Sequence, residues 1–159
     1  MKRKAKRIAT ELRNDTLEVV AQMLIDEADG IRYDVYADGS CKNGTGGCGW
    51  LVLHKGVIVK VGKALFSSMY NNSVEAELGA VVHALGDCPF SCSVDVYVDC
   101  QAAIGKIVDG KLGDLEGVYN KVIQGKVVRL HWVKAHDGNE LNEMADSLAY
   151  SAILGQNDR

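Results

Sequence analysis

The chain has 159 residues, of which 47% are hydrophobic and 25% charged, and its formal net charge is −3. This length suits one domain with its own hydrophobic core, and the composition is that of a globular protein. The acidic balance excludes the broadly basic surface typical of nucleic-acid-binding proteins, so any contact with nucleic acid must come from a local site. No apolar run approaches the roughly 20 residues of a membrane-spanning helix, and we expect neither a membrane span nor a secretory signal.

The five cysteines are an odd number in a chain of this size. An odd count favours reduced thiols and therefore a cytoplasmic location. Cys88 and Cys92 are close enough in sequence to form a local pair, although two separate thiols are the favoured interpretation.

Residues 1–32 differ in pattern from the rest of the chain. A basic run at residues 2–7 comes first, and it is either a nucleic-acid contact or a solvated tail. Apolar residues then recur at the spacing of one helix face, which ends at Asp29-Gly30; they are Leu17, Val20, Ala21, Leu24, Ile25 and Ala28. We therefore expect a basic N-terminal extension with an amphipathic helix over residues 1–32 and a separate domain over residues 33–155.

From Tyr33 onward the pattern changes to strands and then to strands alternating with helices. In chain order we expect a strand at 33–37, a glycine-rich turn at 44–49, a hairpin of strands 50–54 and 57–65 turning at Lys55-Gly56, a helix at 74–86, a strand at 93–98, helices at 101–108 and 115–124, a strand at 127–133 and a helix at 141–154. Strands that alternate with helices pair in parallel through crossovers. The prediction is an α/β fold with a five-stranded mixed sheet, its first three strands antiparallel and the others parallel, flanked by helices.

Two aspartates follow predicted strands. Asp38 comes directly after the first strand and Asp99 directly after the fourth. Functional sites in α/β sheets form beyond the carboxyl ends of parallel strands. If these two strands are neighbours, Asp38 and Asp99 lie side by side.

Two more carboxylates come from helices. Glu77 lies on the flank of the apolar face made by Leu78, Val81, Val82 and Leu85, and Asp146 lies on the flank of the final helix. At 100° per residue, a flank position lets a side chain reach along the sheet edge. A surface acid or a helix cap is the alternative for any one of these residues taken alone.

Four carboxylates that lie close together would repel one another and raise some of their pKa values. Hard divalent cations such as Mg²⁺ relieve this repulsion, because they prefer carboxylate oxygens. Two such ions roughly 4 Å apart can clamp an in-line phosphoryl displacement. The sequence therefore predicts an open acidic site for phosphoryl chemistry.

Several spaced blocks between Tyr33 and Leu154 resemble the type 1 ribonuclease H family. They are Asp38-Gly39-Ser40-Cys41 with Gly49-Trp50, Asn71-Asn72 with Glu77-Leu78 and Ala84-Leu85, Val96-Tyr97-Val98-Asp99-Cys100-Gln101, and Trp132-Val133-Lys134-Ala135-His136 with Asn142-Glu143 and Ala145-Asp146. The resemblance implies an endoribonuclease that hydrolyses the RNA strand of RNA–DNA hybrids with two Mg²⁺ or Mn²⁺ ions and leaves 3′-OH and 5′-phosphate ends.

The resemblance also assigns roles to particular residues. Asp38, Glu77, Asp99 and Asp146 would bind the metals, and His136 would assist proton transfer or product release from a loop, since histidine changes charge near neutral pH. The substrate-binding residues it implies are Gly39, Ser40, Cys41, Asn43, Asn72 and Gln101. Amide and backbone groups of this kind can recognise the 2′-OH that distinguishes RNA from DNA.

The chain departs from the family pattern in ways that concern binding of the hybrid. Gly44, Cys100 and Ala135 replace a common proline, serine and glycine, and none of these changes removes a metal ligand. The chain lacks the lysine-rich handle helix and the N-terminal hybrid-binding domain of other members, which predicts weak, salt-sensitive binding. A non-catalytic hybrid- or protein-binding module, and another nuclease of the ribonuclease H-like superfamily, remain the alternatives.

Overall fold

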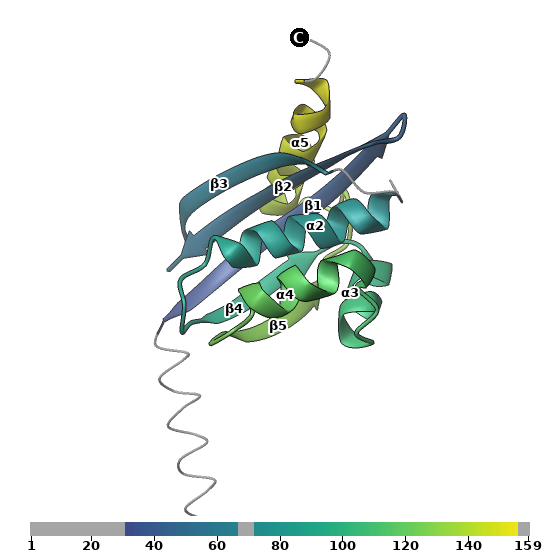
Figure 1. The fold of residues 1–159 in the computed structure, drawn as a ribbon. Helices are drawn as coiled ribbons and strands as arrows, with labels where there is room; N and C mark the ends of the chain where they lie inside the picture. Colours follow the sequence, from purple (N-terminus) through teal and green to yellow (C-terminus); the bar gives the residue numbers. More distant parts are fainter. Residues whose placement is uncertain (1–30, 67–71, 156–159) are drawn as a thin grey trace, which may run out of the picture.

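The computed structural model describes residues 31–66 and 72–155. The described residues form one sheet in the strand order β3-β2-β1-β4-β5 (Figure 1). Its elements are β1 (Arg32–Lys42), β2 (Thr45–His54), β3 (Val57–Phe66), α2 (Ser73–Gly86), β4 (Ser93–Val98), α3 (Gln101–Val108), a 3₁₀ turn (Gly113–Leu115), α4 (Glu116–Val122), β5 (Val127–Trp132) and α5 (Glu140–Leu154). The basic run and the amphipathic helix predicted within residues 1–30 lie outside the described residues.

The sheet is mixed, as the sequence predicts. β1 pairs antiparallel with β2, and β2 pairs antiparallel with β3. β4 joins the other side of β1 in parallel, and β5 extends the sheet in parallel beyond β4. The predicted fold class is therefore confirmed, and β1 and β4 are neighbours as the argument about Asp38 and Asp99 requires.

The first hairpin differs from the prediction. The expected strand at 33–37 continues to Lys42, and the expected glycine-rich turn is the start of β2. The turn itself is Asn43-Gly44, with φ of 52° and 77°; positive φ at both positions favours this dipeptide in a two-residue hairpin. Asp38 therefore lies inside β1, paired with Gly49, and does not end the strand.

The glycines of β2 serve close packing. A Cβ atom on Gly49 would lie 2.2 Å from the carbonyl oxygen of Ala145, and one on Gly47 would lie 2.2 Å from that of Ala149. Side chains at these positions would hold α5 away from the sheet. The predicted glycine-rich turn is thus wrong beyond Gly44, because Gly47 and Gly49 are strand residues that allow close contact with a helix.

The helices cover the two faces of the sheet unequally. In Figure 1, α2 and α4 lie in front of the sheet and α5 lies behind it, toward the Asn43-Gly44 hairpin. The front layer encloses the main core, in which Val35, Val52 and Val96 of the sheet pack with Val81 and Leu85 of α2.

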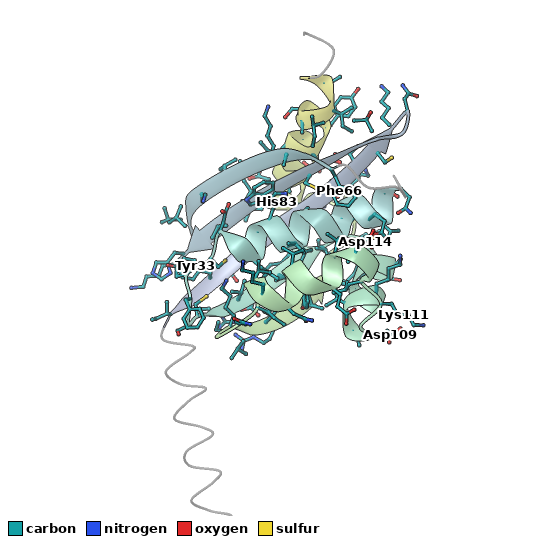
Figure 2. All side chains as sticks on the ribbon, viewed as in Figure 1. Tyr33, Phe66, His83, Asp109, Lys111 and Asp114 are labelled. Carbon is teal, nitrogen blue, oxygen red and sulfur yellow. The ribbon has the colours of Figure 1, made fainter. Side chains whose placement is uncertain are left out.

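At the margin of the front layer, His83 stacks on Trp50 with ring centroids 4.6 Å apart. Figure 2 labels Phe66 and His83 at this margin. The ring of Phe66 packs on Gly79, where a Cβ atom would come within 2.6 Å of it. No helix among the described residues is long and apolar enough to span a membrane.

Candidate active site

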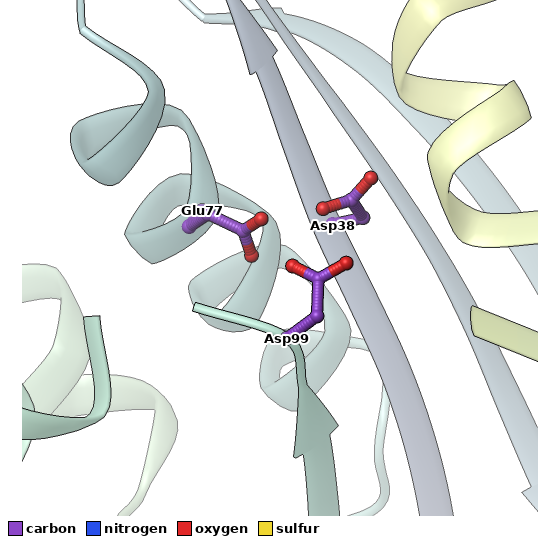
Figure 3. Close-up of side chains that lie close together, drawn as sticks. All are labelled: Asp38, Glu77 and Asp99. Atoms are coloured by element: carbon purple, nitrogen blue, oxygen red, sulfur yellow. The ribbon is translucent and has the colours of Figure 1, made fainter. Parts of the chain in front are cut away.

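Three carboxylates from three different elements converge beside β1. Asp38 of β1, Glu77 of α2 and Asp99, which directly follows β4, each offer one oxygen atom, and these atoms all lie within 4.8 Å of one another (Figure 3). Asp38 and Glu77 are each 4% exposed. The structure therefore brings together three of the four acidic residues that the sequence predicts as ligands.

Strand register places the two aspartates side by side. Tyr36 of β1 pairs in parallel with Tyr97 of β4. Two residues farther along each chain, Asp38 and Asp99 follow at the same level and on the same face, because side chains alternate with a period of two. The prediction that these two carboxylates would be neighbours is confirmed, although β1 continues past the site.

The start of α2 delivers Glu77. Asn72 caps the helix by accepting a hydrogen bond from the backbone N–H of Glu75 at 2.9 Å. The helix then lies so close to β1 that a Cβ atom on Gly39 would be 2.1 Å from the backbone nitrogen of Glu77. The backbone N–H of Gly39 also donates a hydrogen bond to the Glu77 carboxyl. Gly39, predicted from the resemblance to bind substrate, thus has a structural function here in seating Glu77.

Asp146 of α5 approaches from the other face of the sheet. Its side chain is half-buried and accepts a hydrogen bond from the Asp38 carboxyl. It does not belong to the group within 4.8 Å, so its contact runs through Asp38. The close packing of α5 on Gly49 brings Asp146 this near.

Burial of the carboxyls raises their pKa values. Desolvation is the largest cause at Asp38, whose pKa rises to about 7, and the nearby charges of Asp99 and Asp146 add to the rise. Desolvation and the hydrogen bond to Asp38 raise the pKa of Glu77 strongly. Without an added cation the carboxyls share protons, with Glu77 donating to Asp38.

The donor set fits divalent cations. Among the described residues, none of the three clustered carboxylates forms an ion pair, and the buried Oε2 atom of Glu77 lacks a hydrogen-bond partner. A buried carboxylate without a cation is costly. Hard oxygen-preferring cations such as Mg²⁺ would compensate that cost and would replace the shared protons.

Two residues that sequence reasoning passed over hold Asp99 in place. Asn142 is 2% exposed, and its Nδ2 atom donates to Oδ2 of Asp99 at 3.1 Å. The indole Nε1 atom of Trp132 donates to the carbonyl oxygen of Asp99 at 3.2 Å. Both residues stood within the recognised sequence blocks. Asn142 also precedes Asp146 by four residues, which places both on one face of α5 and was a usable signal.

The predicted substrate-binding residues lie at different distances from the carboxylates. Gln101 begins α3 two residues after Asp99, and Asn72 begins α2. Ser40 and Cys41 continue β1 toward the hairpin, where Asn43 lies about 16 Å along the strand from Asp38. Asn72 and Gln101 therefore lie within a few residues of a clustered carboxylate in the chain, whereas Ser40, Cys41 and Asn43 lie progressively farther from Asp38 along β1.

His136 lies on the exposed turn between β5 and α5, as the sequence predicts. Its φ of 53° is unusual for a residue with a side chain. The turn ends at Asn139, which caps α5 by accepting from the backbone N–H of Asn142 at 3.1 Å. The histidine is thus carried on the loop that leads directly into the helix of Asp146.

Comparison with known proteins identifies the family of the chain. The ribonuclease H family model matches residues 32–154. Ribonuclease HI of Campylobacter jejuni is 30% identical over 134 residues, which cover 76% of this chain and 90% of that protein. A ribonuclease H of Paramagnetospirillum magneticum is 34% identical over 139 residues, covering 76% and 88%.

A solved structure supports the fold. RNase H1 from the halophilic archaeon Halobacterium salinarum matches 78% of this chain and 98% of its own, with a TM-score of 0.62 and 22% sequence identity. The family match covers the sheet, all the described helices and the clustered carboxylates. The chain therefore belongs to the ribonuclease H family.

Proposed function

We propose that this chain is an endoribonuclease that hydrolyses the RNA strand of RNA–DNA hybrids and leaves 3′-OH and 5′-phosphate ends. The observation that carries the proposal is the convergence of Asp38, Glu77 and Asp99 within 4.8 Å at an edge that no cation of the described residues neutralises. Family membership supplies the reaction class.

Asp38, Glu77 and Asp99, with Asp146 beside Asp38, would hold two Mg²⁺ or Mn²⁺ ions. Such ions, when bound, supply a nucleophile at neutral pH and stabilise charge on the phosphoryl oxygens. The protein holds these carboxylates close together on separate elements, and bound cations would displace the protons that burial favours. Asn142 donates a hydrogen bond to Oδ2 of Asp99 and so orients this carboxylate.

His136 would exchange protons with the leaving group or product from the turn before α5. Gly39, Ser40, Cys41, Asn43, Asn72 and Gln101 remain the proposed contacts to the hybrid. For Asn72 and Gln101 the proposal has support from their closeness to Glu77 and Asp99 in the chain. A cytoplasmic location is also part of the proposal and rests on the odd number of cysteines.

A cleavage assay tests this function. Labelled RNA–DNA hybrid, RNA duplex and DNA duplex of one sequence are incubated with the full chain and Mg²⁺ or Mn²⁺. We expect cleavage of the RNA strand of the hybrid alone, with 5′-phosphate on the downstream fragment.

The control variants separate the site from its surroundings. Asp38→Asn should abolish cleavage, whereas Asp34→Asn, four residues earlier on the same strand and face, should retain it. Hybrid that is bound but uncut with either metal would favour the binding-module alternative. Cleavage of the DNA duplex would favour another nuclease of the superfamily.

A further inference from the structure

Residues 39–42 of β1 continue past the acidic site toward the hairpin. Pairing of β1 with β4 ends at Tyr36 and Tyr97, whereas pairing of β1 with β2 continues to Lys42. Beyond Asp38, the edge of β1 that faces β4 is therefore not paired with that strand. A strand of nucleic acid that leaves the carboxylates along this edge passes Lys42 before it reaches the hairpin.

Lys42 is exposed and forms no ion pair with the described residues. Its Nζ atom donates to the hydroxyl oxygen of Tyr150 in α5 at 3.3 Å and lies 5.4 Å from the centre of the Tyr150 ring. Lys106 of α3, by contrast, pairs with the Glu75 carboxylate at 2.8 Å. An aromatic ring positions an ammonium group through the cation–π interaction but does not neutralise it. The charge of Lys42 is therefore available to an anion.

One flank of α5 contacts both the acidic site and Lys42. Asp146 and Tyr150 are four residues apart and share that flank of the helix. Asp146 accepts a hydrogen bond from Asp38, and Tyr150 accepts one from Lys42. Asp38 and Lys42 are also four residues apart, with Ser40 between them on the same face of β1. The acidic site and the Lys42 ammonium group therefore lie on one side of the sheet, about 13 Å apart along the strand.

This separation matches the spacing of phosphates in a nucleic acid. Each strand of a duplex carries one phosphate per about 3.4 Å of axis, so 13 Å corresponds to about four nucleotides. The chain has a net charge of −3 and lacks the lysine-rich handle helix, so its hold on a phosphate backbone depends on single local cations. A lysine serves this purpose as a point charge, which adds affinity without reading base sequence.

We propose that Lys42, positioned by Tyr150, binds a phosphate of the RNA strand about four nucleotides from the phosphate that is cut. This inference rests on the proposed function, because the carboxylates that act on the RNA strand define where that strand begins its path along β1. Lys63 provides a matched comparison. It bonds to the next residue of α5, Ser151, at 3.2 Å, but it extends from β3, which β2 separates from β1.

Fluorescence anisotropy of a labelled hybrid across salt concentrations tests the charge of Lys42. Every protein is the full chain with Mg²⁺ and carries Asp99→Asn, so that the hybrid is bound and not cut. Lys42→Met should weaken binding about five- to tenfold and lower the slope of log affinity against log salt by about 0.7–0.9, the amount for one phosphate. Lys42→Arg should restore both quantities, and Lys63→Met should change neither. Equal slopes for Lys42→Met and Lys63→Met would overturn the proposal.

A scan of the phosphates locates the contact. A neutral methylphosphonate replaces one phosphate of the RNA strand at a time. One replacement, about four nucleotides from the wild-type cut, should weaken binding to the Asp99→Asn protein about five- to tenfold and leave binding to its Lys42→Met variant unchanged. Equal losses in both proteins at every position would overturn the proposal. A wild type that cuts no hybrid would contradict the proposed function, whereas coupling between Lys42 and one phosphate would still be decided by this scan.

Discussion

Two groups of side chains, one around Asp95 and one made by Asp38, Glu77 and Asp99, compensate for buried negative charge in different ways. Asp95 of β4 is fully buried. It accepts hydrogen bonds from the guanidinium groups of Arg32 (Nε at 2.8 Å) and Arg129 (Nε at 2.9 Å), and the imidazole Nε2 atom of His131 lies at 2.7 Å. Four residues later on the same chain, Asp99 faces Asp38 and Glu77 instead.

The pKa values express the difference. Burial would raise the pKa of Asp95, but hydrogen bonds from Arg129, His131 and Arg32 outweigh it and hold that pKa well below the usual range. At Asp38 burial is not opposed by any such cation, and the pKa rises to about 7. A buried carboxylate that is paired with cationic side chains of the protein needs no added ion to compensate its charge. A cluster without them requires cations from outside, which is the condition of a metal site.

The largest expected effect is the loss of hybrid cleavage when a carboxylate of the acidic site is replaced. Asp99→Asn should lower the rate of hybrid cleavage by at least about 10³-fold, because it removes a charged ligand from the site. The free energy of unfolding should change by less than about 1 kcal/mol. Rates come from single-turnover cleavage, and retention of more than a tenth of the wild-type rate would contradict the assignment of Asp99.

The pH dependence of stability should have opposite signs at the two groups. The pKa of Asp38 is raised from 3.8 to about 7 on folding, so the folded protein binds this proton more tightly. Its contribution to stability is present below pH 4 and is lost as the pH rises toward 7. We expect a loss of about 2–4 kcal/mol across this window in metal-free protein.

Urea denaturation in the presence of a chelator measures that window. Asp38→Asn should lessen the slope but leave the part due to Glu77, whose pKa is also raised, and Mg²⁺ added at pH 7 should restore stability to the wild type more than to the variant. Asp95 behaves oppositely, because its pKa is lowered on folding: its contribution is present at neutral pH and is lost only as acid protonates it. An unchanged slope in Asp38→Asn would show that other groups dominate the window.

Asp95→Asn should lower the free energy of unfolding and leave the cleavage rate nearly unchanged. Removing the charge takes from Arg32 and Arg129 the buried carboxylate that they share, and we expect a loss of about 2–3 kcal/mol in the free energy of unfolding. The partial exposure of both guanidinium groups keeps this figure below that of a fully buried pair. Cleavage per folded molecule at low temperature should stay within about twofold of the wild type. A large loss of activity in a stable Asp95→Asn protein would break the comparison.

The sequence pattern predicts the carboxylates of the acidic site but does not predict the group around Asp95. Asp38 and Asp99 could be predicted because each follows a hydrophobic strand run, and strand ends converge in parallel sheets. The Asp95 group could not, because Arg32, Asp95 and Arg129 come from three strands whose register only the folded sheet defines.

The boundary of β1 was mispredicted for a related reason. Glycines that suggest a turn locally become strand residues when α5 packs on them, and that contact joins residues about 100 positions apart. Local sequence therefore defines which elements form more reliably than it defines where they end.

The smallest expected effect concerns the hydrogen bond by which Asn142 of α5 holds the Asp99 carboxylate. Asn142→Ala removes the hydrogen bond to Asp99, and we expect metal affinity to fall about tenfold with little change in stability, because such supporting contacts orient the ligands. Asn139→Ala is the matched control at the same helix start, since it removes only the cap. That control should cost about 1 kcal/mol of stability and leave metal affinity unchanged.

Titration calorimetry with Mn²⁺ and thermal unfolding measure the two quantities independently of catalysis. If both asparagine variants lose stability equally and bind metal as the wild type does, Asn142 is only a structural residue of α5. If Asn142→Ala alone weakens binding, the Asp99 carboxylate depends on a neutral amide for its orientation. Asp95 differs in that both of its oxygens already have partners in the protein, among them the guanidinium groups of Arg32 and Arg129.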